Sequence, residues 1–223
     1  MAQSMNLKPF YMGFALLVVV GSAAIWWARS TGSAPVEVGP IPVSTSDFSG
    51  YVLGSDSAKV EIIEYADFGC GACAHYAVVT GPDVKKRLVE TGRVRVRFRD
   101  FPIPSHPQSP DAHLAAACAG EQGQFYPMHD QIFFGQRDWT RQRRPERRFR
   151  DYAEALRLDM DRYDSCVKDR LLLGQIEAAK QEGITVGVHS TPSFVVGGLL
   201  VVGALPYDSL VSLVERVEAA AAR

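Results

Sequence analysis

The sequence has little net charge and few cysteines. Its 223 residues carry 24 Lys and Arg against 25 Asp and Glu, which gives a formal net charge of −1. Such a chain lacks the long-range basic field on which nucleic-acid binding normally depends, so we expect no nucleic-acid partner. Four cysteines are too few for a disulfide-rich miniprotein, and a hydrophobic content of 47% excludes wholesale disorder. The chain is long enough to bury a sizeable core without cross-links.

Two of the cysteines form a CxxC motif, Cys70-Gly71-Ala72-Cys73. Such a motif is half of a zinc site, a redox-active dithiol, or an inert structural disulfide. A zinc site normally needs a second ligand pair at short spacing. Here Cys118 and Cys166 stand far apart, and the five histidines form no HxxxH or CxxH pair. The spacing therefore favours the redox dithiol and predicts neither a metal nor a cofactor, with the inert disulfide as the alternative.

The surroundings of the motif support redox chemistry. Residues 59–66 form a β-rich run, and residues 74–90 follow a helical pattern, so Cys70 is expected at a helix N-terminus. Unpaired N–H groups and the helix dipole stabilise a thiolate there and lower a cysteine pKa from about 8.5 to roughly 3.5–7. Cys73, one turn further on, is expected to be the less exposed partner. In the oxidised form, a substrate thiolate would attack Cys70 and Cys73 would leave.

The N-terminus carries an uncharged apolar run over residues 10–28. As a helix it would be roughly 28 Å long, enough to cross a bilayer core. We expect residues 1–28 to be either an uncleaved membrane anchor, which the continuation through Ile25-Trp26-Trp27 favours, or a cleaved signal peptide. A buried core helix is the third reading. Both membrane readings export the rest of the chain to an oxidising compartment. Residues 29–47, rich in Ser, Gly and Pro, are predicted to be a flexible linker.

The remaining pattern predicts an α/β fold with a helical insertion. A strand is expected after the first helix, then several helices, then a hairpin and a closing helix. The predicted strands are residues 93–101, 191–196 and 199–202. The predicted helices are residues 109–119, 124–135, 146–157, 161–169, 169–182 and 206–222. The body of the fold should begin near Phe48.

Four segments together resemble the DsbA-like thiol:disulfide oxidoreductases, a branch of the thioredoxin-fold superfamily with a helical insertion. The segments are Glu64-Tyr65-Ala66-Asp67-Phe68 before the CxxC motif; Ala115-Ala116-Ala117-Cys118-Ala119 with Glu121-Gln122-Gly123-Gln124-Phe125 and His129-Asp130; Thr191-Pro192-Ser193-Phe194; and Gly197-Gly198. The resemblance covers roughly residues 50 to 220. It implies a thioredoxin-like domain over 48–106 and 184–223 and an all-helical insertion over 107–183.

The resemblance also implies roles for three further residues. Pro192 corresponds to the family's cis-proline beside the redox pair, and Thr191 would supply backbone groups that hold the substrate. Glu64, six residues before Cys70, occupies the family's buried acidic position beneath the disulfide and is a candidate proton acceptor for Cys73. An exposed strand carboxylate is the alternative for Glu64, because Glu61 confuses the assignment of faces.

Cys118 and Cys166 fall on two predicted helices of the insertion. In an oxidising compartment we expect a structural disulfide between them, and two buried free thiols are the alternative. Closing a loop of about 50 residues would contribute roughly 4 kcal/mol in the chain-entropy model.

These observations predict a membrane-tethered, exported thiol:disulfide oxidoreductase, periplasmic or otherwise extracytoplasmic, and secreted if the N-terminus is cleaved. The expected activity is oxidation of reduced exported proteins, and the resemblance implies a membrane quinone-linked reoxidase of the DsbB or VKOR type as partner. The pair Gly71-Ala72 departs from the family's usual dipeptide, so its oxidising strength stays open. The alternatives are a thiol reductase, for example in cytochrome maturation, and a non-enzymatic copper or peptide chaperone.

Overall fold

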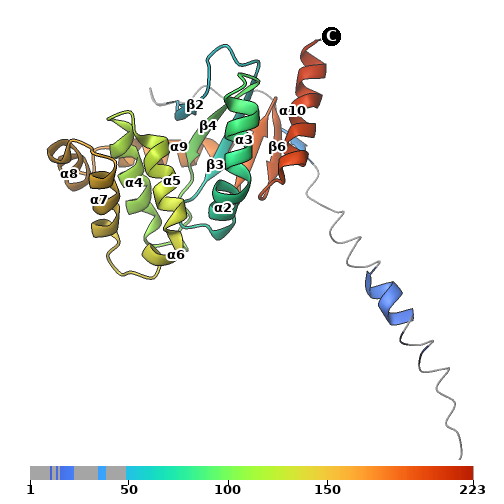
Figure 1. Ribbon diagram of the computed structural model, residues 1–223, viewed down its shortest axis with the longest axis horizontal. Coiled ribbons are helices and arrows are strands. Elements are labelled where there is room, and N and C mark those ends of the chain that lie inside the picture. Colours follow the sequence, from blue (N-terminus) through green and yellow to red (C-terminus); the bar gives the residue numbers. More distant parts are fainter. Residues whose placement is uncertain (1–10, 12–13, 15, 23–34, 39–48, 223) are drawn as a thin grey trace, which may run out of the picture. The chain divides into compact units, whose positions relative to one another are not determined.

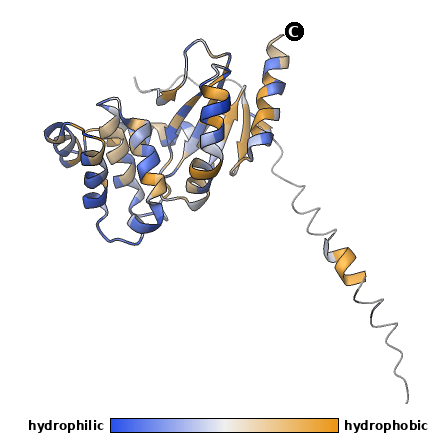
Figure 2. Ribbon diagram, viewed as in Figure 1, coloured by the Kyte–Doolittle hydropathy of each residue, from blue (hydrophilic) through white to orange (hydrophobic). Residues whose placement is uncertain are grey.

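The computed structural model describes residues 11, 14, 16–22, 35–38 and 49–222. The chain divides into two units, Met1–Ala34 and Pro35–Arg223. In the first unit, residues 16–22 are helical, and Figure 2 shows this short helix as hydrophobic. Most of the predicted anchor or signal segment, 1–28, lies outside the described residues, as does most of the predicted linker. No helix among the described residues is both long and apolar enough to span a membrane.

The second unit is built on one mixed sheet of six strands (Figure 1). The strand order is β1-β6-β5-β3-β4-β2, in which β3 and β4 are parallel and the other neighbouring pairs are antiparallel. A parallel pair needs a crossover connection, which a helical run supplies here. The strands are β1 (Val36–Glu37), β2 (Tyr51–Leu53), β3 (Val60–Ala66), β4 (Val94–Asp100), β5 (Ser193–Val196) and β6 (Leu199–Val202).

The crossover is a continuous helical run that begins directly after Cys70. It consists of α2 (Gly71–His75), the π-helical η1 (Tyr76–Thr80), α3 (Gly81–Val84) and the π-helical η2 (Lys85–Val89). The run starts three residues earlier than the predicted helix at 74. Pro82 lies in the first turn of α3, where the missing N–H of proline is tolerated, so the run continues past it.

The chain between β4 and β5 is helical, as the sequence predicted. Helices α4 to α8 gather at one end of the sheet, and α9 packs on β4 (Figure 1). These helices are α4 (Ser109–Gly120), α5 (Phe125–Phe134), α6 (Gln136–Trp139), α7 (Glu146–Ala155), α8 (Met160–Lys168) and α9 (Leu173–Thr185), and α10 (Tyr207–Ala221) follows β6. The domain boundaries 48–106, 107–183 and 184–223 stay predictions.

Alternation along β3 distributes its side chains between two apolar layers. Ile62 packs with Leu88 of η2 and Leu213 of α10 on one face. Tyr65 packs on the other face with Val186, which directly follows α9. Both faces of the central strand are therefore covered, and the end of β3 leads into the motif from a rigid position.

The two outermost strands differ from the sequence-based expectation. β1 lies inside the predicted linker, where Val36 and Glu37 pair with Leu200 and Leu199 of β6. β2, which pairs with β4, was not predicted at all. Segments of two or three residues are too short to display a period-two pattern, so the sequence offers no signal for either strand.

Candidate active site

The CxxC motif lies where β3 gives way to the helical run. Cys70 is the N-cap residue of α2, and Cys73 lies within that helix. Both cysteines are in the free thiol form in this structure, at 9% and 0% exposure. The arrangement is the predicted one, with Cys70 as the more exposed sulfur at the start of a helix.

The two thiols have opposite pKa shifts. A hydrogen bond from the Cys73 thiol, together with the backbone N–H groups of Ala72 and Cys73, outweighs burial and lowers the pKa of Cys70 to about 5. Burial raises the pKa of Cys73 well above its usual value, and the neighbouring Cys70 sulfur adds to the effect. At neutral pH, Cys70 is therefore a thiolate and nucleophile, and Cys73 a protonated thiol.

The carboxylate of Asp67 fixes the turn that precedes the motif. It is fully buried and accepts hydrogen bonds from the backbone N–H groups of Gly69 at 2.8 Å and Ile103 at 3.0 Å. The Ser109 hydroxyl donates to it as well, and His106 Nδ1 lies 2.6 Å from it. Burial alone would raise the pKa of Asp67, but His113, together with the Ser109 and His106 side chains, holds it well below its usual range.

A buried histidine completes this charged cluster. His113 has no exposed surface; its Nδ1 lies 2.6 Å from Asp100 Oδ1, and its Nε2 lies 3.6 Å from Asp67 Oδ1. Burial alone would favour the neutral ring, but the two carboxylates raise the pKa of His113 to about 9. The imidazolium thus neutralises part of the negative charge beneath the motif.

A residue of the helical insertion also holds the motif. Gln136, at the start of α6, is buried, and its side-chain Nε2 donates to the carbonyl oxygens of Phe68 at 2.6 Å and Cys70 at 2.9 Å. The predicted helix 124–135 continues into α6, which brings this amide to the redox loop.

The Thr191-Pro192 segment lies beside the reactive sulfur, as the resemblance implied. The Thr191–Pro192 peptide bond is cis. The Cys70 Sγ lies 3.3 Å from the Thr191 carbonyl oxygen, which accepts a hydrogen bond from the thiol form. Thr191 lies two residues before the start of β5, so β5 and the end of β3 together frame the site.

Glu64 is buried rather than an exposed strand carboxylate. It is 5% exposed, and burial raises its pKa to about 8. Glu61, by contrast, lies on the other face and pairs with Arg95 and Arg97, each at 2.7 Å. Glu64 lies on β3, and the turn that follows this strand leads to Cys70. The side chain of Glu64 lines a cavity beside the helical run.

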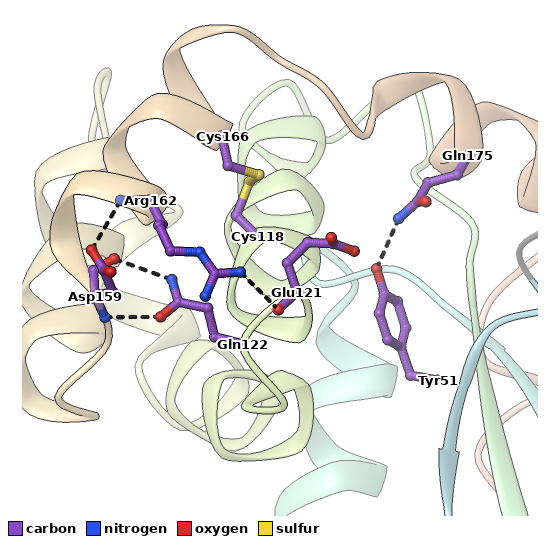
Figure 3. The surroundings of a disulfide bond; sticks show 8 residues. All are labelled: Tyr51, Cys118, Glu121, Gln122, Asp159, Arg162, Cys166 and Gln175. Atoms are coloured by element: carbon purple, nitrogen blue, oxygen red, sulfur yellow. Dashed lines mark hydrogen bonds between the residues drawn. A yellow bond between two sulfur atoms is a disulfide. The ribbon is translucent and has the colours of Figure 1, made fainter.

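Cys118 and Cys166 form a disulfide within the insertion (Figure 3). Cys118 lies on α4 and Cys166 on α8, with their Cα atoms 5.8 Å apart. Figure 3 shows a second link between these regions, in which the side chain of Gln122 bonds to the backbone N–H and carbonyl of Asp159. The disulfide is therefore separate from the CxxC pair and braces the insertion.

Sequence reasoning missed Asp67, His106, His113 and Gln136 as parts of the site. Asp67 belongs to a segment that carries the family resemblance, but no role was predicted for it. The other three residues lie 36 to 66 positions beyond Cys70 in the sequence. Their polar atoms converge only after the insertion folds over the end of β3. Among the described residues, no cluster of three or more His, Cys, Asp or Glu side chains has the arrangement of a metal site.

Known proteins resemble this chain in sequence and in fold. A family model described as Thioredoxin matches residues 47–216. The Na(+)/H(+) antiporter NhaA 3 of Salinispora tropica is 36% identical over 149 residues, which is 66% of this chain and 22% of that protein. A Rickettsia bellii protein, named as a candidate protein-disulfide oxidoreductase, is 26% identical over 69% of this chain and 59% of its own length.

The chain thus spans less than two thirds of the length of either curated relative. In fold, the crystal structure of Wolbachia pipientis α-DsbA1 matches with a TM-score of 0.69 at 19% identity, over 79% of this chain and 92% of that one. The family match covers most of the chain, and the fold includes the cis-proline and the helical insertion. The chain belongs to the thioredoxin family and has the fold of its DsbA-like members.

Proposed function

We propose that this protein is a thiol:disulfide oxidoreductase whose reacting pair is Cys70 and Cys73. The observation that carries the proposal is the opposite tuning of the two thiols. The pKa of Cys70 is lowered to about 5, and that of Cys73 is raised well above its usual value. A structural pair would not need one sulfur held as a thiolate at a helix start and its partner held as a thiol.

The exchange proceeds in two steps. In the disulfide form, a substrate thiolate attacks the sulfur of Cys70, the Cys70–Cys73 bond breaks, and Cys73 leaves and takes up a proton. A second substrate thiolate then attacks the substrate sulfur of the mixed disulfide and expels Cys70 as a thiolate. Two electrons pass from the substrate dithiol to the cysteine pair, and the substrate gains a disulfide.

We further propose that the protein works as an oxidase. A low pKa of Cys70 stabilises the reduced form relative to the disulfide, which raises the reduction potential and favours release of Cys70 as the leaving group. Thiol reduction, for example in cytochrome maturation, is the competing direction, because the dipeptide Gly71-Ala72 also tunes the potential. The potential itself decides between the two.

Four neighbouring residues have supporting roles in this proposal. Glu64 exchanges a proton with Cys73, as an acid when Cys73 leaves and as a base when Cys73 is deprotonated. The backbone of Thr191 binds the extended substrate beside Cys70, and Pro192 shapes the surface that the substrate contacts. The side chain of Gln136 acts on the motif only through the backbone, so it is a positioning residue.

We place the protein outside the cytoplasm, tethered to the membrane by residues 1–28 or released if that segment is cleaved. Its substrates would be reduced exported proteins, and a quinone-linked membrane enzyme of the DsbB or VKOR type would reoxidise the pair. A segment similar to this chain occurs in an Na(+)/H(+) antiporter, where the match covers 22% of that protein. This match supports the proposal that the chain is a redox module that acts at a membrane. It does not imply antiporter activity for this chain.

The deciding experiment is a redox titration of Cys70–Cys73 combined with refolding of reduced ribonuclease A. A potential near about −120 mV with formation of ribonuclease disulfides supports the oxidase, and a potential near about −270 mV supports the reductase. A Cys70→Ser variant as active as wild type would exclude redox catalysis and leave the copper or peptide chaperone. Sequencing the N-terminus of the cell-derived protein separates the uncleaved anchor from the cleaved signal peptide.

A further inference from the structure

A cavity of about 430 Å³ lies between the helical run that follows the motif and helix α5. Tyr76 and Pro82 line it from the run, Tyr126 and Phe133 line it from α5, and Glu64 lines it from the sheet. Small-molecule sites typically have volumes of about 300–1,000 Å³ and mainly apolar walls with a few polar groups. The cavity meets both conditions.

One buried carboxyl oxygen of this cavity has no hydrogen-bond partner in the part of the chain that the structure describes. Glu64 is 5% exposed, and its Oε1 has no hydrogen-bond partner among the described residues. Leaving a buried acceptor without a donor costs about 1–3 kcal/mol. A ligand that brings a donor to Oε1 recovers this free energy on binding, whereas a purely apolar ligand does not.

The charges and rings of the lining select the type of donor. Asp130 lies 2.8 Å from His129, and Lys85 is a further cation of the lining, whereas Glu64 Oε1 has no partner among the described residues. An ionised carboxylate ligand brings no hydrogen-bond donor to Glu64 Oε1, whereas an ammonium group does. Aromatic faces combined with carboxylates bind ammonium groups, through cation–π contacts and charge-assisted hydrogen bonds. The aromatic side chains in the lining are those of Tyr76, Tyr126, Phe133 and Phe134.

We propose that this cavity binds a small aromatic amine, with its ammonium group on Glu64 and its ring among the aromatic side chains of η1 and α5. The side chain of Phe134 is 81% exposed, so the cavity has an apolar, solvent-accessible border. The volume suits a molecule of one or two rings. The site follows from the cavity and from Glu64, and it does not depend on the redox function proposed above.

Two glycines provide a matched pair of variants. Gly81 lines the cavity in a helical conformation, and a Cβ there would meet no heavy atom closer than 3.5 Å, the Tyr76 carbonyl oxygen. Gly81→Leu therefore adds a Cβ without a clash, and we expect the rest of its side chain to occupy part of the cavity. Gly174 lies on α9, outside the cavity lining, and a Cβ there would meet nothing within 4 Å. Gly174→Leu is the same substitution away from the site, and Glu64→Gln keeps nearly the same shape but cannot ionise to pair with an ammonium group.

The test is isothermal titration calorimetry of the reduced protein with 2-phenylethylamine and tryptamine. We expect saturable binding of at least one amine. Binding should weaken at least about tenfold in Gly81→Leu and in Glu64→Gln, and change by less than about twofold in Gly174→Leu. The uncharged 2-phenylethanol and the acid 3-phenylpropionate should each bind at least about tenfold more weakly than 2-phenylethylamine.

Several results would overturn the proposal. They are the absence of saturable binding of both amines, equal affinity for 3-phenylpropionate, and undiminished binding to a Gly81→Leu protein whose circular dichroism matches wild type. Disulfide exchange measured on wild type and Gly81→Leu reports separately on the redox function, so failure of one proposal leaves the other standing.

Discussion

The side-chain amide nitrogen of Gln136 lies 2.9 Å from the carbonyl oxygen of Cys70 and 2.6 Å from that of Phe68. A residue of the helical insertion therefore holds the backbone on both sides of Gly69. The insertion contributes to the placement of the nucleophile as well as to the outline of the site.

Replacing Gln136 with Met should weaken this placement. The variant keeps the length of the side chain but removes both donors, and two buried carbonyl groups then lose a partner. We expect a loss of about 1–3 kcal/mol in the free energy of unfolding and a rise in the pKa of Cys70. Thiolate absorbance at 240 nm measures the pKa. Gln131→Met, on the exposed side of α5, is the control, and an unchanged Cys70 pKa in Gln136→Met would limit Gln136 to a structural role.

The low pKa of Cys70 should appear as a pH-dependent difference between the reduced and oxidised proteins. The pKa of Cys70 is about 5 in the folded state against an ordinary value of 9.0. The thiolate therefore stabilises the folded dithiol form, and this contribution is complete above about pH 9. This contribution is lost as the pH falls toward 5. We expect the stability of the reduced protein relative to the disulfide form to rise between about pH 5 and 9, by at most about 1.4 kcal/mol per pH unit. Urea unfolding of both forms measures it, and a flat difference would contradict the shift.

Glu64 should have the opposite sign. Its pKa of about 8 lies above the ordinary value of 4.5, so the folded state holds a proton that the unfolded state releases. Wild type therefore loses stability as the pH rises through this window, and Glu64→Gln avoids the loss. We expect the variant to match wild type near pH 4 and to be more stable at pH 8. Glu177→Gln on the exposed surface of α9 is the control, and equal stability at pH 8 would indicate an ordinary carboxylate at Glu64.

Removal of the insertion disulfide should reduce stability without stopping the exchange reaction. The bond joins Cys118 and Cys166 across a sequence separation of 48 residues. The double variant Cys118→Ala and Cys166→Ala should lose roughly 4 kcal/mol in the chain-entropy model. Thermal unfolding and the rate of disulfide exchange below the melting temperature are the two measurements. A large loss of exchange rate in the folded double variant would show that this bond has a redox role.

Asp67→Asn should disturb the cluster beneath the motif in a way that His113 reports. The substitution removes one of two carboxylates that hold the imidazolium, so the pKa of His113 should fall from about 9. Breaking a buried charged network in this way should cost about 3 kcal/mol of stability. NMR titration of the His113 ring measures the pKa. An unchanged value would mean that Asp100 alone sets the protonation of this ring.

The sequence was sufficient for the elements that carry a periodic pattern. The order of the longer strands and helices, the position of Cys70 at a helix start and the cis-proline segment all follow from local pattern or from the family resemblance. The face of Glu64 did not follow, because Glu61 offered an equally acidic alternative. Burial by α5 and the helical run decides it, and burial depends on residues far away in the chain.

Arg99 shows the same limit. Residues 93–101 alternate basic and apolar side chains, a pattern typical of a half-exposed strand, but Arg99 is 1% exposed and donates to Glu182 of α9 at 3.0 Å. Tyr65 donates to the same carboxylate at 2.9 Å. A basic side chain in a strand normally faces solvent, unless an acidic residue from a distant part of the chain pairs with it. Gln136 escaped notice for a related reason, since a single amide in a helical segment has no local signature.

The outermost strands of the sheet have a consequence for contacts with other extended chains. β1 has two residues and β2 has three, and they border the longer β6 and β4. A long exposed edge strand would be a template with which other extended chains could pair and aggregate. Because β1 and β2 are short, they offer few free backbone N–H and C=O groups with which another strand could pair. An extended chain that approaches the molecule therefore finds little free edge on which to build a β-sheet polymer.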